Sequence, residues 1–388
     1  MPQNLIWDNA CVLPIYKETY LCIDNFINTF SANDSSILLI LIINQPNTEN
    51  DSKPQDLLNN LIQKKFIMSW ENGHLSLFNT STNIDLLIID RFTRPIPFRA
   101  GVGLARKIGM DICCKLSHQK KLNCHFVGTT DADTLLPSNY FAVMDCTSSN
   151  YSAICFNYKH IGINDMVTST TLWYEASLRF YQAGLKYAQS SYSFHTIGSC
   201  MAINLLSYAK VRGFPRRAAG EDFYLLNKLR KISPIHENVS CIIKIQSRLS
   251  DRVPFGTGPK VNSLLEIATY SEDCEKTSNE FTSIYYDKRV FDSLKLCLQG
   301  IHSYQNSLAD FPVNSYPEST ALVNLGFKDF QEHCRTQGLS VLQSQHQFFI
   351  WFDAFKQLKY IHFITDHFYP KQKYSTESLS FYTKLLWS

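Results

Sequence analysis

Two aspartates separated by one alanine, Asp131 and Asp133, are the strongest chemical feature of this sequence. They follow an apolar run at residues 125–130, which predicts a buried strand that carries both carboxylates at its carboxyl end. In an open α/β sheet, ligands bind at that edge. Two carboxylates there suit Mg²⁺ or Mn²⁺, which keep other coordination positions for substrate phosphates. For this pattern taken alone, a solvated turn is the alternative.

Four other segments occur in a fixed order around this acidic turn. Two precede it, Val-Leu-Pro-Ile-Tyr-Lys-Glu at 12–18 and Gly-Val-Gly-Leu-Ala-Arg-Lys-Ile-Gly-Met-Asp at 101–111. Two follow it, Gly-Ser-Cys-Met-Ala-Ile-Asn at 198–204 and Gly-Phe-Pro-Arg-Arg-Ala-Ala-Gly-Glu-Asp at 213–222. In this order the segments resemble the GT-A glycosyltransferases, and specifically the large family 2 type, over about residues 10–260.

The resemblance implies one nucleotide-sugar site and gives the first segments a role in holding the nucleoside. Pro14, Tyr16 and Glu18 would lie against the base and ribose. Asn44 stands where many relatives have an acid, and Asp90 would be a second nucleoside contact. An ordinary strand-to-helix turn, in which proline fixes φ, is the alternative for residues 14–18.

The resemblance also implies roles around the donor diphosphate. Asp131 would contact the ribose or the ion, and Asp133 would bind Mg²⁺ or Mn²⁺ directly. Arg106 matches the family position that faces the diphosphate side of the donor. Lys107 beside it is equally well explained as part of a solvated basic face.

The acidic pair Glu221–Asp222 begins a segment with helical spacing. Acids in the first turn of a helix interact favourably with the positive end of the helix dipole, which is a purely structural explanation. The resemblance instead implies that Asp222 is the general base for the acceptor hydroxyl, with Glu221 supporting it or contacting the acceptor.

A loop that contains Arg248 and Arg252 follows the last expected strand. Guanidinium groups suit phosphate oxygens, although surface ion pairs are the alternative. Polymerising members of family 2 carry Gln-x-x-Arg-Trp here, and this chain has no such tryptophan. A non-processive transfer is therefore expected.

Some GT-A enzymes use a late histidine as a further metal ligand, and His236 is the candidate by position. A structural or solvated histidine is the commoner explanation. Chain order alone suggests three residues for the acceptor side, namely His195, Tyr192 and Trp173.

The elements that must position these residues follow an alternating strand–helix pattern. Strands are expected at residues 10–15, 36–43, 84–90, 125–130, 151–156, 198–203 and 239–245. Helices are expected at residues 20–30, 55–66, 103–116, 170–188 and 220–231. The expected fold is α/β, a GT-A (Rossmann-like) domain with a mostly parallel sheet at residues 1–265, followed by a helical region at 266–388.

The C-terminal region is expected to contain helices at 288–301 and 340–363, joined by a polar, proline-containing link. In the second helix Phe348, Trp351, Phe352 and Phe355 recur at helical spacing. Such a face either packs in a core or contacts a partner or a membrane interface.

Composition limits the other classes of function. The chain has 388 residues, a net charge of +3 and 45% hydrophobic residues, which describe a globular protein without the strong basic excess of a nucleic-acid binder. The longest apolar run is much shorter than a membrane span, and no secretory signal is visible. The 12 cysteines lack CxxC spacing, so we expect reduced thiols and a cytoplasmic protein, with peripheral contact at the inner face of the membrane as an option.

The sequence therefore predicts metal-dependent, inverting transfer of one sugar from a nucleotide-diphosphate donor to a hydroxyl acceptor, which could be a saccharide, a lipid-linked or a small molecule. A nucleotidyltransferase and a non-catalytic nucleotide-sugar-binding scaffold are the alternatives. The first would need a Gly-rich, basic signature after strand one, where this chain has Pro-Ile-Tyr-Lys-Glu. Retention of both Asp133 and Asp222 disfavours the second.

Overall fold

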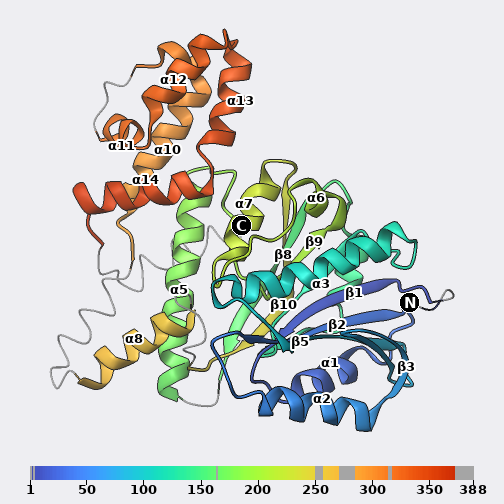
Figure 1. Cartoon of the computed structure of the whole chain (residues 1–388). Helices are drawn as coiled ribbons and strands as arrows, with labels where there is room; N and C mark the ends of the chain where they lie inside the picture. The colour runs from blue at the N-terminus through green and yellow to red at the C-terminus, as the bar shows by residue number, and fades with distance from the viewer. Residues whose placement is uncertain are drawn as a thin grey trace. The chain divides into compact units, whose positions relative to one another are not determined.

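The computed structural model describes residues 2, 5–162, 165–249, 257–270, 285–312 and 317–371 (Figure 1). The chain divides into two compact units, Met1–Thr168 with Thr196–Lys260, and Ser169–His195 with Val261–Ser388. The sequence analysis places residues 169–195 in the first domain, whereas in the structure this segment groups with the C-terminal part.

Apolar runs that are buried on both faces form the centre of the sheet in the first unit. Four central strands pair in parallel, β1 (Asn9–Ile15), β2 (Ile37–Pro46), β5 (Ile84–Ile96) and β6 (Phe126–Thr129). Every residue of β2 from Ile37 to Gln45 is buried. The absence of hydrophobic alternation in this run thus correctly predicted a central parallel strand.

The described residues form one ten-stranded sheet in the order β3-β4-β5-β2-β1-β6-β9-β8-β10-β7. The remaining strands are β3 (Ile67–Asn72), β4 (Leu75–Asn79), β7 (Thr134–Leu135), β8 (Ala153–Ile161), β9 (Met201–Asn204) and β10 (Ile235–Gln246). Seven of the ten strands run in one direction, with β4, β7 and β9 reversed. The expected α/β class with a mostly parallel sheet is confirmed.

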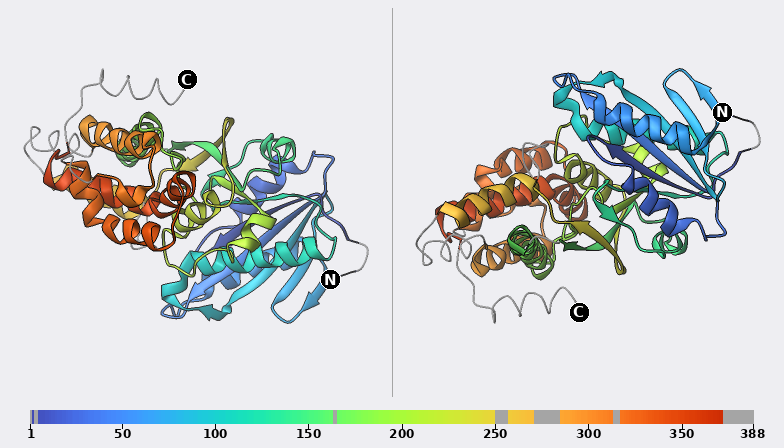
Figure 2. Two further views of the ribbon diagram at one scale, coloured as in Figure 1. Left: turned by 90° about the horizontal axis from the view of Figure 1, so that it is seen from above. Right: turned by 90° about the horizontal axis from the view of Figure 1, so that it is seen from below.

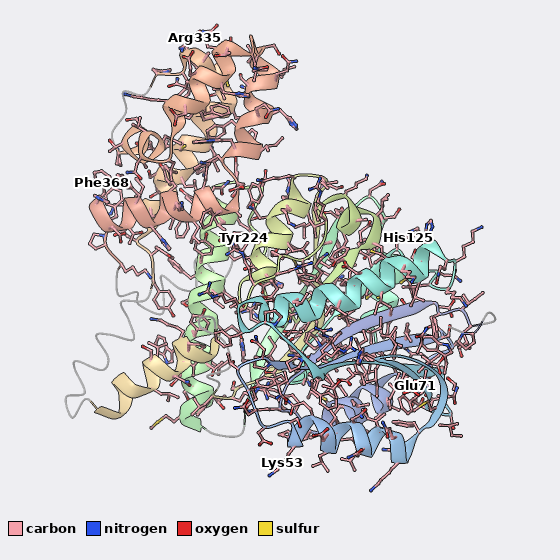
Figure 3. All side chains as sticks on the ribbon, in the orientation of Figure 1. Lys53, Glu71, His125, Tyr224, Arg335 and Phe368 are labelled. Carbon is pink, nitrogen blue, oxygen red and sulfur yellow. The ribbon has the colours of Figure 1, made fainter. Side chains whose placement is uncertain are left out.

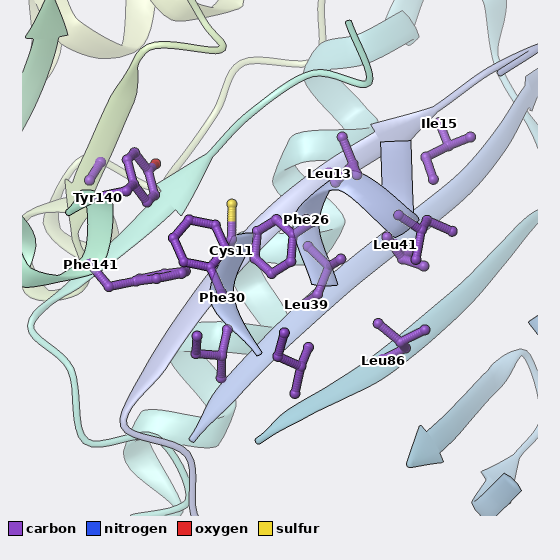
Figure 4. Close-up of a cluster of buried hydrophobic side chains, with 14 of the residues drawn as sticks. Cys11, Leu13, Ile15, Phe26, Phe30, Leu39, Leu41, Leu86, Tyr140 and Phe141 are labelled. Carbon is purple, nitrogen blue, oxygen red and sulfur yellow. The ribbon is translucent and has the colours of Figure 1, made fainter. Parts of the chain in front are cut away.

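Helices cover both faces of this sheet (Figure 2). α1 (Leu21–Phe30), α2 (Lys53–Lys65) and α4 (Tyr140–Cys146) pack on one face. There Phe26, Phe30 and Phe141 meet Cys11 and Leu39 (Figure 4).

The other face is covered by α3 (Gly101–His118). A Cβ on Gly109 of α3 would lie 2.5 Å from Val12 Cγ1 and 2.9 Å from Ile42 Cδ1. Only glycine therefore allows α3 to approach β1 and β2 this closely. The shorter helices α6 (Leu205–Lys210) and α7 (Glu221–Arg230) complete the unit, with a 3-10 turn at Phe98–Ala100.

The β3–β4 hairpin was missed by the sequence analysis. Its strands are short and β3 is almost wholly exposed, so they lack the apolar runs that identified the other strands. The dipeptide Asn72–Gly73, with Gly73 at φ +61°, lies at the turn. Asn-Gly between two short strands is a recognised hairpin signal and could have predicted it.

The second unit is helical and has a core rich in aromatic residues. Its described helices are α5 (Asp165–Tyr187) and α8 (Thr257–Tyr270), both of which begin in the first unit, and α10 (Lys288–Ser303), α11 (Glu318–Asn324), α12 (Phe327–Thr336), α13 (Val341–Trp351) and α14 (Ala354–His367), with a 3-10 turn at Leu308–Asp310. Phe348, Phe352 and Tyr360 are fully buried within this core. Core packing, and not a membrane face, accounts for these three side chains.

The single helix expected at 340–363 is wrong, because the chain breaks between α13 and α14. Asp353 has extended φ/ψ and accepts hydrogen bonds from the backbone N–H groups of Phe355 and Lys356, both at 3.2 Å. An aspartate in this position is a helix N-cap. The aromatic periodicity continues across the break and concealed it. Within the described ranges, no helix has both the length and the apolar character needed to cross a bilayer.

Candidate active site

Several predicted site residues meet where β1, β6 and β10 end. β1 and β6 pair in parallel, and the backbone N–H of Thr130 donates to the Val12 carbonyl at 3.1 Å. The segments that follow these strands therefore leave the sheet side by side. The backbone N–H of Gln246, the last residue of β10, donates to the Asp133 carbonyl at 2.8 Å, which brings Arg248 to the acidic turn.

The first assembly, the Arg106 cluster, consists of Arg106, Asp131 and Glu221. The Arg106 side chain is only 3% exposed, and its Nη2 donates to Asp131 Oδ1 at 2.6 Å. Its Nη1 donates to Glu221 Oε1. Burial alone would lower the pKa of Arg106, but the nearby carboxylates raise it above its ordinary value. Arg106 thus joins residues of α3, the acidic turn and α7.

The second assembly, the Arg248 cluster, consists of Arg248, Glu18 and Asp133. Arg248 Nη2 and Nη1 donate to the two Glu18 oxygens at 2.7 and 3.1 Å, and Nε donates to Asp133 Oδ2 at 2.8 Å. This is a bidentate pair extended by a third contact. The Arg248 side chain is 33% exposed. The loop after β1 and the segment after β10 are therefore tied to the acidic turn.

Glu221 and Asp222 occupy the first turn of α7, which begins after Gly220 at φ +71°. Burial raises the pKa of Glu221 to about 7, even though Arg106 acts to lower it. Burial also raises the pKa of Asp222. The Asp222 side chain accepts from the backbone N–H of Phe223 at 2.7 Å. Asp222 is thus a carboxylate of raised proton affinity, and it remains partly exposed.

Gly198 allows the Arg106 guanidinium to lie where it does. A Cβ on this residue would lie 2.5 Å from Arg106 Nη1 and 2.8 Å from Cζ. Its backbone N–H hydrogen bond partly offsets the effect of burial, which raises the pKa of Asp222, and its carbonyl accepts from Thr129 Oγ1 at 2.5 Å. The sequence analysis found Gly198 only as part of a motif and missed this role, because the contact joins residues 92 positions apart.

Two of the expected nucleoside residues have local partners near the end of β1. Tyr16 Oη donates to Glu49 Oε2 at 3.2 Å, and Lys17 also pairs with Glu49. The Lys17 ammonium and a backbone N–H lower the pKa of Glu49 to about 2. Pro14 lies within β1, opposite Ile42 of β2.

The other two nucleoside candidates are engaged by backbone groups. The Asn44 side chain is buried, and with its NH₂ group directed to the carbonyls of Ile15 and Ile42 it donates to both at 3.2 Å. Asp90 Oδ1 accepts from the backbone N–H groups of Phe92 and Thr93, each at 3.0 Å. A nucleoside role stays a prediction for all five candidates, Pro14, Tyr16, Glu18, Asn44 and Asp90.

His236 is not placed to bind a metal with the acidic turn. It lies at the start of β10, on the order of 30 Å along the strand from the Gln246 end that contacts Asp133. Its ring instead packs on Tyr151 with the centroids 5.1 Å apart. The distance follows from the length of β10, which the sequence analysis underestimated by starting the strand at residue 239.

Of the remaining candidates, one has a partner on its own helix, one lies outside the described residues and three belong to the second unit. Lys107 pairs with Asp111 on α3, as expected for a solvated basic face. Arg252 lies outside the described residues. Trp173, Tyr192 and His195 belong to the second unit, in which Tyr192 Oη donates to the Phe349 carbonyl at 3.2 Å.

Among the described residues, no group of three or more His, Cys, Asp or Glu side chains is arranged to hold a metal ion. A cation such as Mg²⁺ needs only one or two carboxylates when substrate phosphates complete its shell. Asp131, whose side chain is 38% exposed, and the neighbouring Asp133 offer hard oxygen ligands of that kind. The donor set therefore fits a cation that is shared with a phosphate-bearing ligand.

Comparison with known proteins gives neither a family model nor a curated protein that matches this chain. Solved structures are found at low similarity. Residues 1–349 of Staphylococcus aureus TarS in complex with UDP-GlcNAc are 12% identical with a TM-score of 0.40, covering 87% of this chain and 89% of that one. A Pyrobaculum calidifontis mannosyltransferase with GDP-Man and Mn²⁺ is 11% identical with a TM-score of 0.39, covering 92% and 90%.

A third such structure is glucosyl-3-phosphoglycerate synthase from Mycobacterium tuberculosis with Mn²⁺, UDP and glucosyl-3-phosphoglycerate. It is 13% identical with a TM-score of 0.35, covering 75% of this chain and 79% of that one. These proteins are GT-A glycosyltransferases, the class that the sequence motifs resemble. Because the TM-scores are below 0.5, we infer no property of this chain from them.

Proposed function

We propose that this protein is a glycosyltransferase that moves one sugar from a nucleotide-diphosphate sugar to a hydroxyl acceptor. The observation that carries the proposal is the meeting of the Arg106 cluster, the Arg248 cluster and Asp222. Residues from segments spread over more than 200 positions place five carboxylates and two guanidinium groups around one sheet edge. If residues 131–133 were only a solvated turn, and residues 221–222 only an ordinary helix N-terminus, their side chains would not need these ion pairs with distant arginines.

The acidic turn would hold the donor through its diphosphate. Asp131 and Asp133 would bind Mg²⁺ or Mn²⁺ together with phosphate oxygens, and the cation, when bound, offsets the negative charge on the departing nucleoside diphosphate. Arg106 and Arg248 fix the orientation of the two aspartates. We regard Arg106 as a positioning residue, because at 3% exposure its guanidinium is committed to carboxylates.

Asp222 would act as general base. It accepts the proton of the acceptor hydroxyl while that oxygen forms a bond to the anomeric carbon and the bond from this carbon to the diphosphate breaks. Burial raises the pKa of Asp222, which brings it closer to the operating pH, where a general base works best. A single displacement of this kind inverts the anomeric configuration. Glu221 would support Asp222 because both carboxylates interact electrostatically with the Arg106 guanidinium.

We infer a non-processive reaction, because Gln246-Ser247-Arg248 is followed by leucine where polymerising relatives carry tryptophan. The acceptor of this proposed reaction is a saccharide, a lipid-linked molecule or another small molecule with a hydroxyl group.

Nucleotide binding tests the donor site first. Thermal unfolding would be measured with UDP, GDP, CDP and dTDP, each with and without Mn²⁺. A ligand that binds the native state raises the apparent melting temperature by mass action. We expect one nucleotide to stabilise the protein only with Mn²⁺, and Asp133→Ala to abolish this effect. Stabilisation by none of them, with the protein folded, would contradict the proposal.

Turnover separates an enzyme from a scaffold. With the matching nucleotide sugar, release of the nucleoside diphosphate and transfer to a panel of acceptors would be measured for wild type and Asp222→Asn. We expect Asp222→Asn to lower kcat by about 10²–10⁴ while nucleotide binding persists. Equal turnover of the two proteins would remove Asp222 as the base. Release of pyrophosphate in place of sugar transfer would indicate a nucleotidyltransferase.

A further inference from the structure

The distribution of charge along the chain is uneven near the proposed site. Residues 91–110 and 205–220 contain nine of the 37 basic residues and none of the 34 acidic ones. All the acids therefore lie elsewhere, and the rest of the chain has more acids than bases. The two segments together carry a net charge of +9, whereas the whole chain carries only +3.

The fold brings these two segments together. The backbone N–H of Gly103 donates to the Arg217 carbonyl at 3.0 Å. A Cβ on Gly103 would lie 2.5 Å from the Pro215 carbonyl oxygen, and one on Gly101 would lie 2.5 Å from Ala218 Cα. The loop before α7 thus lies against the start of α3 in direct backbone contact.

Three exposed arginines border this contact, and we call them the arginine rim: Arg99, Arg216 and Arg217. None of them forms an ion pair with any residue that the structure describes. The Arg217 guanidinium lies 4.0 Å from the centroid of the Tyr224 ring on α7, which is labelled in Figure 3. Arginine without a carboxylate partner is suited to bidentate recognition of phosphate, sulfate or carboxylate.

The rim is close to the proposed base. Arg217 precedes Asp222 by five residues, so their Cα atoms are at most about 18 Å apart. The buried Arg106 is already occupied by Asp131 and Glu221, so it leaves the exposed arginines to attract a further anion.

We propose that the arginine rim binds an anionic acceptor, one that carries phosphate, sulfate or carboxylate groups near the hydroxyl that receives the sugar. This acceptor role rests on the proposed glycosyltransferase function. The same arginines could instead bind the diphosphate of the donor. The test must therefore distinguish an anionic acceptor from the donor diphosphate.

The test uses the full chain saturated with the nucleoside diphosphate and Mn²⁺ identified above. Binding of a short inorganic polyphosphate, and of a neutral maltooligosaccharide as its uncharged counterpart, is measured by calorimetry at low and high salt. Arg99→Gln/Arg216→Gln/Arg217→Gln is compared with Lys53→Gln/Lys64→Gln/Lys115→Gln. The second variant loses the same charge from exposed lysines outside both segments.

We expect polyphosphate, and not the neutral sugar, to bind in a salt-sensitive manner. The rim variant should weaken this binding by at least roughly tenfold, and the lysine variant by less than about twofold, because charge-assisted contacts are specific to geometry. Nucleotide affinity should be the same in all three proteins. The single variant Arg216→Gln repeats the comparison should the triple variant unfold.

Equal weakening in the rim and lysine variants would overturn the proposal, because it would show an effect of net charge alone. Loss of nucleotide affinity in the rim variant would assign the rim to the donor and also overturn it. If wild type binds no nucleotide, the glycosyltransferase function and the acceptor role both fail. Rim-dependent polyphosphate binding, measured without nucleotide, would in that case still establish the anion site.

Discussion

The Arg106 cluster and the Arg248 cluster lie at the same sheet edge and use the same chemistry, yet their surroundings differ. Arg106 is 3% exposed and Glu221 3%, whereas Arg248 is 33% exposed. In the Arg106 cluster, burial disfavours the charged forms of Arg106 and Glu221, although each stabilises the charge of the other. Burial prevails at Glu221 and raises its pKa. In the second, solvent screens a guanidinium that spans Glu18 and Asp133.

This difference separates two tasks. A buried arginine cannot leave its carboxylates without exposing unpaired charges to a poor solvent. A partly exposed arginine can exchange its carboxylates for another anion at small cost. The Arg106 cluster is therefore suited to hold the site together, and the Arg248 cluster is suited to rearrange if the proposed donor and cation bind. Four substitutions test this contrast.

The largest effect is expected from Arg106→Met. It leaves Glu221 buried without its cation, and removing one partner of a buried pair costs about 3–5 kcal/mol. Urea denaturation would measure the loss in the free energy of unfolding, with Arg248→Met as the matched control. A loss below about 1 kcal/mol for Arg106→Met would show that the buried cluster does not stabilise the fold.

Glu221→Gln should change how stability depends on pH. Because burial raises the pKa of Glu221 from 4.5 to about 7, the folded state binds this proton more tightly than the unfolded state. The stabilisation from Glu221 is complete below pH 4.5 and is lost as the pH rises through 7.

Over that window, the unfolding free energy of wild type should fall by about 3 kcal/mol relative to the glutamine variant. Urea denaturation of both proteins at several pH values measures this difference. Parallel pH profiles would mean that Glu221 is ionised and paired throughout, and that its burial is less costly than the structure indicates.

Gly198→Ala tests how tightly the buried cluster is packed. The new Cβ would lie 2.5 Å from Arg106 Nη1, and the guanidinium cannot move without lengthening its contacts with Asp131 and Glu221. Overpacking of this kind costs about 1–3 kcal/mol. Thermal unfolding checks it, with Gly300→Ala as the comparison for the steric effect, because the nearest atom to a Cβ on Gly300 would be Phe311 Cζ at 3.8 Å. Wild-type stability in Gly198→Ala would indicate a mobile Arg106.

The smallest effect on stability is expected from Arg248→Gln, below about 1 kcal/mol, because the pair is partly solvated. If Arg248 only holds Asp133 until the cation binds, the nucleotide should still raise the melting temperature of Arg248→Gln in the presence of Mn²⁺. Loss of that shift without loss of fold would instead make Arg248 a direct donor contact.

The positions of the two aspartates and of the Glu221–Asp222 pair could be predicted from sequence because each follows or begins a regular element. The continuous apolar character of β2 and the strand before Asp131 were sufficient to place them in a parallel sheet. The exposed strand β3 and the break at Asp353 could not be found in this way, since neither interrupts or creates a strong hydrophobic period.

The amino-acid sequence by itself determined which residues could do chemistry and at which edge of an α/β sheet they would lie, because hydrophobic periodicity is local. Only the tertiary structure decided their partners. Arg106 meets Glu221 across 115 positions and Arg248 meets Glu18 across 230. Such pairings, and the burial that raises the pKa of Glu221 and Asp222, arise from packing between distant segments, which no short stretch of sequence encodes.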